Sequence, residues 1–379
     1  MEKILKRKAF FLCLILVSAL LIMGCEKGDS SSMAVKEKQE PEVGKSLLPA
    51  DDIEKFLPII IEEGNFGKVY GWLDNQTIVY STTLQNSSNI YTYHLKKGTS
   101  TLLLRVESMI DSIHISHSGH YLLIRSTSEA SPSKITVITN KGKMVFSEGL
   151  ENAFDAAVVW NPYDEDKVLI SSFTDDWQET TFILSIKTQQ MTEVDVANPF
   201  SYWISTNKLI YLNLNLKNQS GFTDVVMKDL SNGKEVRLLS DIFQLDSFYR
   251  FFLTITADKE NVNDVIYSFY NQKVKFEGSI TMPGLTSFSD WLIPYYDYNE
   301  EKETFISFKP LKSGTAESYT EDFQLIQYRM GSETNTVIMD GLNNEPISCN
   351  QEGNLCLYGY FFEKLIDMKN KEIMRLNQI

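Results

Sequence analysis

The segments SIHISHSGHYLLIR (residues 112–125) and KITVITNKGKMVF (residues 134–146) decide the predicted fold. Each holds two runs of aliphatic, β-branched or aromatic residues, and a short turn containing glycine, Gly119 or Gly142, joins the two runs. Glycine at such a turn accepts the positive φ that a tight hairpin needs. Two hairpins joined by a polar loop predict one four-stranded antiparallel sheet.

The same layout recurs along the chain, from about residue 69 to the end. The period is roughly 40–45 residues apart from one longer unit, and this is the spacing of four-stranded propeller blades. No helical periodicity of useful length follows residue 24. The sequence therefore predicts an all-β fold, a β-propeller with seven repeats and six blades as the alternative. The other units begin near Val69, Phe154, Phe200, Asp246, Thr286 and Glu345.

Tryptophans support this register. Trp72, Trp160 and Trp203 each fall at the end of the first strand of a unit, and Trp291 lies slightly later in its unit. We interpret them as packing residues that fill the gap between neighbouring blades. A short strand-like run at residues 56–62 precedes the first unit, and we expect it to close the ring.

The N-terminal segment has the pattern of a bacterial lipoprotein signal. Basic residues precede an apolar run over residues 9–23, which is shorter than the roughly 20 residues that cross a bilayer. The run ends in LIMGC (residues 21–25), which resembles the lipobox, although Met23 is less usual there than Ser or Ala. We expect residues 1–24 to be removed and Cys25 to be lipidated. The alternatives are a plain signal peptide or an uncleaved helix with a chance cysteine.

Composition divides the remaining chain and limits its partners. Residues 25–55 would comprise the lipidated cysteine and a flexible tether, because residues 26–50 have no aromatic residue, and residues 56–379 would form the propeller. Loss of residues 1–24 removes four basic residues and one acidic residue, so the net charge changes from −14 to about −17. Such a surface repels nucleic acid but leaves cations, basic peptides and neutral sugars as ligands.

The lipobox, the tether and the turns at residues 74–76 and 117–120 resemble those of the YqgU-type bacterial lipoproteins. This resemblance implies a lipid-anchored propeller on the extracytoplasmic side of the cell membrane. It also implies six blades, one fewer than the repeats indicate. It brings no activity and no site residues.

Signatures of catalysis and of metal binding are mostly missing. The sequence has no Gly-x-Ser-x-Gly elbow, no His-Glu-x-x-His, no phosphate-binding Gly-Lys-Ser/Thr loop and no EF-hand loop. His114, His117 and His120 would bind a metal only if they converged, and their run crosses a turn, so we expect no metal site and no cofactor. Cys349 and Cys356 flank a predicted hairpin turn, either as a disulfide or as two small apolar strand residues.

Long polar loops are predicted on one face of the propeller, which we call the long-loop face. It holds the loops between second and third strands and the connections between blades, and the largest predicted loop spans about residues 297–321. Asp111, Asp155 and Asp246 start inner strands and would ring the channel mouth, where they would bind a cation or fix turns. Trp177 would stack on a sugar, hold a cation or fold against its own blade.

These features favour a binding or assembly module at the cell surface over an enzyme. The expected ligand at the long-loop face is a protein, a cation or a glycan. The alternative is a propeller lyase or hydrolase acting on cell-surface glycans, with two carboxyl groups of different pKa at the channel mouth.

Overall fold

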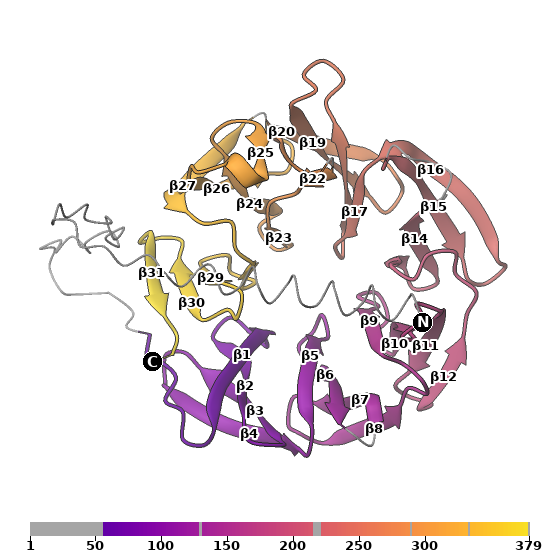
Figure 1. The fold of residues 1–379 in the computed structure, drawn as a ribbon, viewed down its shortest axis with the longest axis vertical. Coiled ribbons are helices and arrows are strands. Elements are labelled where there is room, and N and C mark those ends of the chain that lie inside the picture. The colour runs from indigo at the N-terminus through magenta and orange to yellow at the C-terminus, as the bar shows by residue number, and fades with distance from the viewer. Residues whose placement is uncertain (1–55, 129–130, 215–220, 289, 333, 378–379) are drawn as a thin grey trace, which may run out of the picture. The chain divides into compact units, whose positions relative to one another are not determined.

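Seven four-stranded antiparallel sheets follow one another around a ring in the described part of the chain, and Figure 1 shows the ring. The structure is a computed structural model and describes residues 56–377 apart from 129–130, 215–220, 289 and 333. We number the sheets as blades 1 to 7 in chain order. In each blade the strand that comes first in the sequence lies nearest the centre of the ring.

The first five blades are each built from four consecutive strands. Blade 1 contains β1 (Asn65–Trp72), β2 (Thr77–Thr83), β3 (Ser88–His94) and β4 (Thr99–Val106). Blade 2 contains β5 (Met109–Ile115), β6 (Tyr121–Ser128), β7 (Ser131–Thr139) and β8 (Met144–Gly149). Blade 3 contains β9 (Asp155–Trp160), β10 (Lys167–Phe173), β11 (Glu179–Ser185) and β12 (Gln190–Glu193). Blade 4 contains β13 (Tyr202–Ser205), β14 (Lys208–Leu212), β15 (Thr223–Asp229) and β16 (Lys234–Ile242). Blade 5 contains β17 (Gln244–Ser247), β18 (Phe251–Ala257), β19 (Asp264–Asn271) and β20 (Phe276–Pro283).

A small extra sheet lengthens the sixth unit. Blade 6 contains β23 (Tyr296–Asn299), β24 (Thr304–Pro310), β26 (Phe323–Arg329) and β27 (Asn335–Leu342). The extra sheet contains β21 (Leu285–Ser287), β22 (Asp290–Leu292) and β25 (Gly314–Thr315), followed by a short 3₁₀ helix (Ala316–Ser318). Blade 7 contains β28 (Ile347–Cys349), β29 (Leu355–Tyr358), β30 (Lys364–Asp367) and β31 (Glu372–Arg375).

The extra sheet corrects two sequence expectations. The sixth blade begins at Tyr296 and not near Thr286, which lies in β21. Residues 297–321 are not one loop, because they include part of β23, all of β24 and β25, and the 3₁₀ helix. In the extra sheet Leu285 of β21 pairs in parallel with Gly314 of β25. The two residues are far apart in the sequence, so no local sequence pattern predicts this pairing.

Antiparallel order places the connections on two faces. The turns between first and second strands and between third and fourth strands share one face, which we call the hairpin face. The remaining connections lie on the long-loop face, as the sequence predicted. On that face the connection from β24 to β26 carries β25 and the 3₁₀ helix.

Apolar side chains on both surfaces of each sheet form the core between blades. Middle strands such as β2 and β10 are almost continuously buried, as β-branched runs covered on both sides should be. Each fully buried aliphatic or aromatic side chain contributes about 1.5–3 kcal/mol by leaving water.

Three tryptophans link neighbouring blades in the same way. The indole N–H of Trp72 donates to the carbonyl of Ser348, that of Trp160 to His114, and that of Trp203 to Val159, over 2.9–3.1 Å. Each bond joins the inner strand of a blade to that of the blade before it in the ring. Trp291 lies outside this set, in β22.

The ring closes between blades 1 and 7. Ile59 forms an isolated parallel bridge with Asn377, and its N–H donates to the carbonyl of Leu376 over 2.5 Å. The N–H of Leu57 donates to the carbonyl of Leu95 in blade 1 over 3.1 Å, so the segment contacts both blades. Residues 56–62 therefore lie at the closure as expected, but as a bridge and not as a strand. No helix within the described residues is long and apolar enough to span a membrane.

Candidate functional site

Aromatic side chains gather on the long-loop face of blades 3 and 4. Trp177 is 73% exposed in the β10–β11 loop, and its ring lies 6.3 Å from that of Phe173. Phe173 in turn stacks on Phe200 at 5.6 Å, and Phe200 is 56% exposed. Phe154 is also exposed nearby, and its N–H donates to the carbonyl of Phe173 over 2.7 Å. We call these four side chains the Trp177 patch.

The backbone at Trp177 holds the indole outward. The residue has φ 62°, a left-handed conformation in which a bulky side chain is unusual. Its N–H donates to the carbonyl of Thr174, whose own hydroxyl accepts from the N–H of Gln178. Such strain costs about 1–3 kcal/mol and is found mostly at functional positions.

Acidic side chains surround the Trp177 patch. Glu151, Asp175, Asp176 and Glu179 are exposed in the loops that carry the aromatic rings. In the described segments 150–156 and 172–181 no residue is basic. The patch therefore combines aromatic faces with a rim of negative charge.

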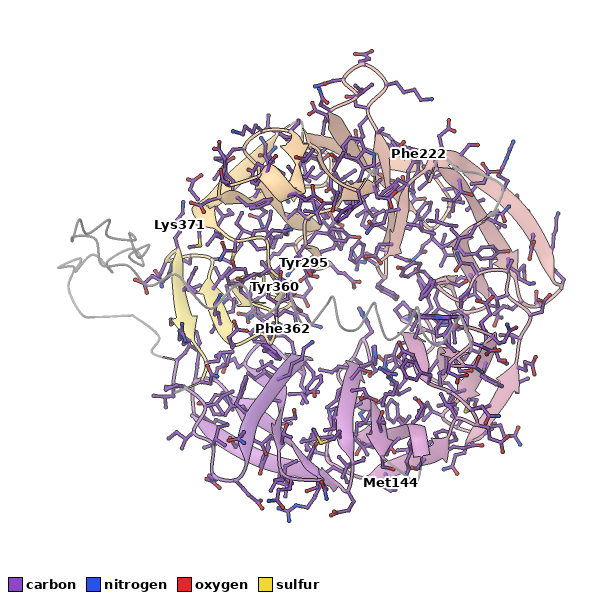
Figure 2. The ribbon with its side chains drawn as sticks, viewed as in Figure 1. Met144, Phe222, Tyr295, Tyr360, Phe362 and Lys371 are labelled. Atoms are coloured by element: carbon purple, nitrogen blue, oxygen red, sulfur yellow. A yellow bond between two sulfur atoms is a disulfide. The ribbon has the colours of Figure 1, made fainter. Side chains whose placement is uncertain are left out.

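A second pair of exposed aromatic residues lies on the same face, between blades 6 and 7. The rings of Tyr295 and Tyr360 approach edge to face, with their centroids 6.3 Å apart. Figure 2 labels both residues. Phe361, next along the chain, is also exposed.

The three predicted channel acids do not form one ring. Asp111 and Asp155 lie near the starts of β5 and β9, whereas Asp246 is the third of four residues in β17, beside the first turn of its blade. Asp111 accepts from the hydroxyl of Thr127 in its own blade. Asp155 accepts from the guanidinium of Arg125 in blade 2 and from the N–H of the residue that follows it.

Asp246 and Asp297 occupy similar positions in blades 5 and 6. One carboxylate oxygen of each accepts a hydrogen bond from the N–H of the following residue. The other oxygen accepts a hydrogen bond from the next blade. Asp246 accepts from the hydroxyl of Tyr296 over 3.0 Å, and Asp297 accepts from the N–H of Cys349 over 2.6 Å. Burial among protein atoms raises the pKa of each carboxyl to about 6.

The hairpin-face end of the central channel contains a cavity of about 730 Å³. Inner strands and first turns of six of the seven described blades line it, blade 4 being the exception. Turn residues from four blades meet there. His117 lies 3.5 Å from Glu300 and stacks on Tyr249 at 4.8 Å, and the Tyr249 ring contacts Tyr163 at 5.1 Å.

The three histidines do not converge. His114 lies in the cavity wall, where burial and then the charges of Arg125 and Lys68 lower its pKa to about 4. His117 faces Glu300, and His120 packs on Tyr121 at 4.5 Å. Across the described residues no group of His, Cys, Asp or Glu side chains is arranged to hold a metal ion.

Two of the cysteines that the sequence singles out lie within the described residues. Cys349 and Cys356 pair across β28 and β29 with their Cα atoms 3.9 Å apart, and their sulfur atoms are bonded. Cys25 lies outside the described residues.

Sequence reasoning missed the cavity and the side chains that surround it. Asp297 and Tyr298 were assigned to a loop because β23 has only four residues. The signal that could have found Asp297 is its placement before an aromatic residue and ahead of a first turn, as at Asp246. Nothing local shows that His117 of blade 2 meets Glu300 of blade 6.

Comparisons with known proteins agree with this architecture. The chain is 21% identical over 364 residues to the uncharacterized lipoprotein YqgU of Bacillus subtilis strain 168, covering 96% of each chain. The crystal structure of an uncharacterized protein from Listeria monocytogenes EGD-e superimposes with a TM-score of 0.78 at 21% identity, covering 86% of this chain and 98% of that one. The β-propeller domain of the trilobed protease of Pyrococcus furiosus gives 0.53 at 13% identity, with 83% and 98% covered. These two likenesses show the fold alone.

A family model described as a YqgU-like 6-bladed β-propeller domain matches residues 94–359. The match begins at the last residue of β3 and ends just after β29, so it contains blades 2 to 6 complete and parts of blades 1 and 7. The described residues form seven four-stranded sheets, one more than that description states. The chain belongs to the YqgU-like β-propeller family.

Proposed function

We propose that this chain is a lipid-anchored binding module on the extracytoplasmic side of the cell membrane, which engages a basic protein partner through the long-loop face. The Trp177 patch carries the proposal, because it combines a 73% exposed indole, a left-handed backbone at that residue and exposed acids in the segments that carry its rings. The name of the Bacillus relative, a lipoprotein, supports the anchor.

The physical argument is one of complementarity. Large aromatic side chains are enriched at binding hot spots, because they bury much area and lose little conformational entropy. A carboxylate rim adds long-range attraction for a basic surface and favours lysine or arginine over the aromatic face. Asp111 at the long-loop end of its strand extends the acidic character toward the channel, whereas the charge of Asp155 is paired with Arg125.

Photocrosslinking in cells that make the full-length chain tests the proposal. Trp177→Ala should abolish crosslinking to the partner, and Trp177→Phe should retain part of the crosslinking. The matched control is Phe276→Ala, since Phe276 is 53% exposed at the start of β20 on the hairpin face and should not matter. Capture should weaken with added salt.

Equal capture by wild type and Trp177→Ala, or loss only in Phe276→Ala, would refute the patch as the interface. Salt-independent capture of a glycan would replace the basic protein with a sugar ligand.

One observation favours the second candidate, an enzyme acting on cell-surface glycans. Asp246 and Asp297 both have a pKa near 6, as carboxyl groups in acid–base catalysis often do. Two observations argue against an enzyme. Both carboxylates already accept hydrogen bonds from other residues of the chain, and neither is in the wall of the channel cavity. Incubation of purified cell-wall glycan with wild type and Asp246→Asn, with new reducing ends measured, decides between the two. Product formed by wild type and lost in the variant would establish the enzyme.

A further inference from the structure

The channel cavity is a second candidate site, separate from the Trp177 patch and independent of the function proposed for it. Its volume of about 730 Å³ lies within the range of small-molecule sites, roughly 300–1,000 Å³. It opens at the hairpin face, on the opposite side of the ring from the long loops. A ligand there would contact six blades at once.

Carboxylates dominate the charge of the cavity. Asp74, Glu300 and Glu301 line it, against the single guanidinium of Arg250, which itself lies 3.8 Å from Glu303. His114 adds no charge at neutral pH, because its pKa is about 4. Walls of one sign around a recess concentrate ligands of the opposite sign.

Aromatic rings form the rest of the wall. Trp72 and Trp160 line the cavity, and their indole N–H groups are already donated to carbonyl oxygens of neighbouring blades. Trp160 is 9% exposed and packs between blades, so the partly exposed ring of Trp72 offers the apolar and π surface, which suits alkyl chains and ammonium groups. Tyr298 also lines the cavity, is 6% exposed, and its hydroxyl has no hydrogen-bond partner among the described residues.

Glu300 is held in place by the turns around it. Its Oε1 accepts from the N–H of Tyr249 over 2.9 Å, and its Oε2 lies 3.5 Å from Nε2 of His117. Contacts from blades 2 and 5 thus fix a carboxylate that belongs to blade 6. A preorganised carboxylate binds a cation without first losing side-chain entropy.

We propose that the channel cavity binds a small organic cation, an aliphatic amine whose ammonium group pairs with Glu300 and Glu301 while its carbon chain packs on Trp72. Asp74, which also lines the cavity, can take a further ammonium group. A polyamine fits this distribution of charge and apolar surface better than a metal ion or an anion does.

Calorimetric titration of the full-length chain in detergent with spermidine tests the inference. Wild type should bind, Glu300→Gln should bind at least tenfold more weakly, and added salt should weaken binding. Glutamine keeps an oxygen to accept from Tyr249. The matched control is Glu193→Gln, an exposed acid at the end of β12 in the outermost strand of blade 3, and it should bind as wild type does.

Glu301→Gln provides a second variant if Glu300→Gln fails to fold, because Glu301 is exposed. It should also weaken spermidine binding. The inference is wrong if wild type does not bind spermidine, if Glu193→Gln weakens binding as much as the cavity variants do, or if uncharged N-acetylglucosamine binds equally well. Trp177→Ala should leave spermidine binding unchanged, which separates this site from the Trp177 patch.

Discussion

Trp160 and Trp177 belong to one blade and occupy opposite surroundings. Trp160 is 9% exposed, stacks near Tyr121 and donates its indole N–H to blade 2. Trp177 stands on a strained loop in water. Recurrence at the end of a first strand was enough to predict the packing role of Trp160. Trp177 has no counterpart in other units, so its exposure had to come from the structure.

Replacement of these two residues by phenylalanine should have unequal effects on stability. Trp160→Phe leaves the carbonyl of His114 without its donor and removes part of a packed ring, so the free energy of unfolding should fall by about 1–3 kcal/mol. Trp177→Phe should change it by less than about 0.5 kcal/mol. Urea unfolding of both variants measures the difference, and equal losses would contradict the assigned roles.

Asp246 makes stability depend on pH. Its pKa is about 6 in the folded chain against 3.8 for the ordinary side chain, so the folded state holds the proton more tightly. The contribution of this proton to the free energy of unfolding is fully present below about pH 4 and is lost as the pH rises through 6. Two pKa units correspond to about 3 kcal/mol, which is an upper bound.

Asp246→Asn tests this directly. The amide keeps an oxygen for the N–H of Ser247 and presents an N–H to the hydroxyl of Tyr296. The variant should be more stable than wild type at pH 7.5 and should lose less stability between pH 5 and pH 7.5. Asp322→Asn, an exposed acid, serves as the control. Parallel pH profiles for wild type and Asp246→Asn would disprove the assignment.

Hairpins are the elements that sequence predicts best in this chain. Alternating or continuous β-branched runs with Gly or Asn between them predict the correct strand pairs in blades 1 and 2 and the approximate starts of blades 3 to 5, because the pairing is local. The prediction for blade 6 was wrong because the pairing there is not local. Its inner strand is short, and the chain between blades 5 and 6 pairs with a loop about 30 residues further on. Contacts across the channel are equally non-local, so the cavity was not predictable.

The hairpin of β28 and β29 is the element most dependent on a covalent bond. Its two strands have three and four residues, and the Cys349–Cys356 disulfide joins them across a loop of about eight residues. Closing such a loop in the unfolded chain contributes about 2 kcal/mol. The Cys349→Ser/Cys356→Ser double variant should therefore melt at lower temperature than wild type. A reductant should lower the melting temperature of wild type and not of the variant; no effect on either would contradict the prediction.

At the scale of the whole molecule, the ring closes where the segment around Ile59 lies between blades 1 and 7. Ile59 is fully buried between blades 1 and 7, whereas Ile60 beside it is 66% exposed. Each blade is made of its own consecutive strands, so no strand is exchanged at the closure among the described residues. The remaining bonds across it include the indole of Trp72 and the N–H of Val69, which donates to Phe361.

Substitutions at these adjacent residues test the closure. Ile59→Asp buries a carboxylate without a partner and should destabilise the chain by at least about 3 kcal/mol. Ile60→Asp should have little effect because its side chain already faces water. Hydrogen exchange should show faster exchange in β1 and β31 for Ile59→Asp alone. Equal protection in the two variants would mean that the ring does not depend on this segment.

The bridge at Ile59 also has a mechanical consequence. The residues that close the ring are the first described ones after the N-terminal segment, and Leu57 donates its N–H to Leu95 of blade 1, so tension in that segment reaches blade 1 and the closure together. The Ile59–Asn377 bridge is a single pair, whereas each blade is held by rows of hydrogen bonds. Under load the closure should yield first, by separation of blade 7 from blade 1, while the individual sheets stay folded. Pulling on the N-terminal segment should therefore open the ring at the junction of blades 1 and 7.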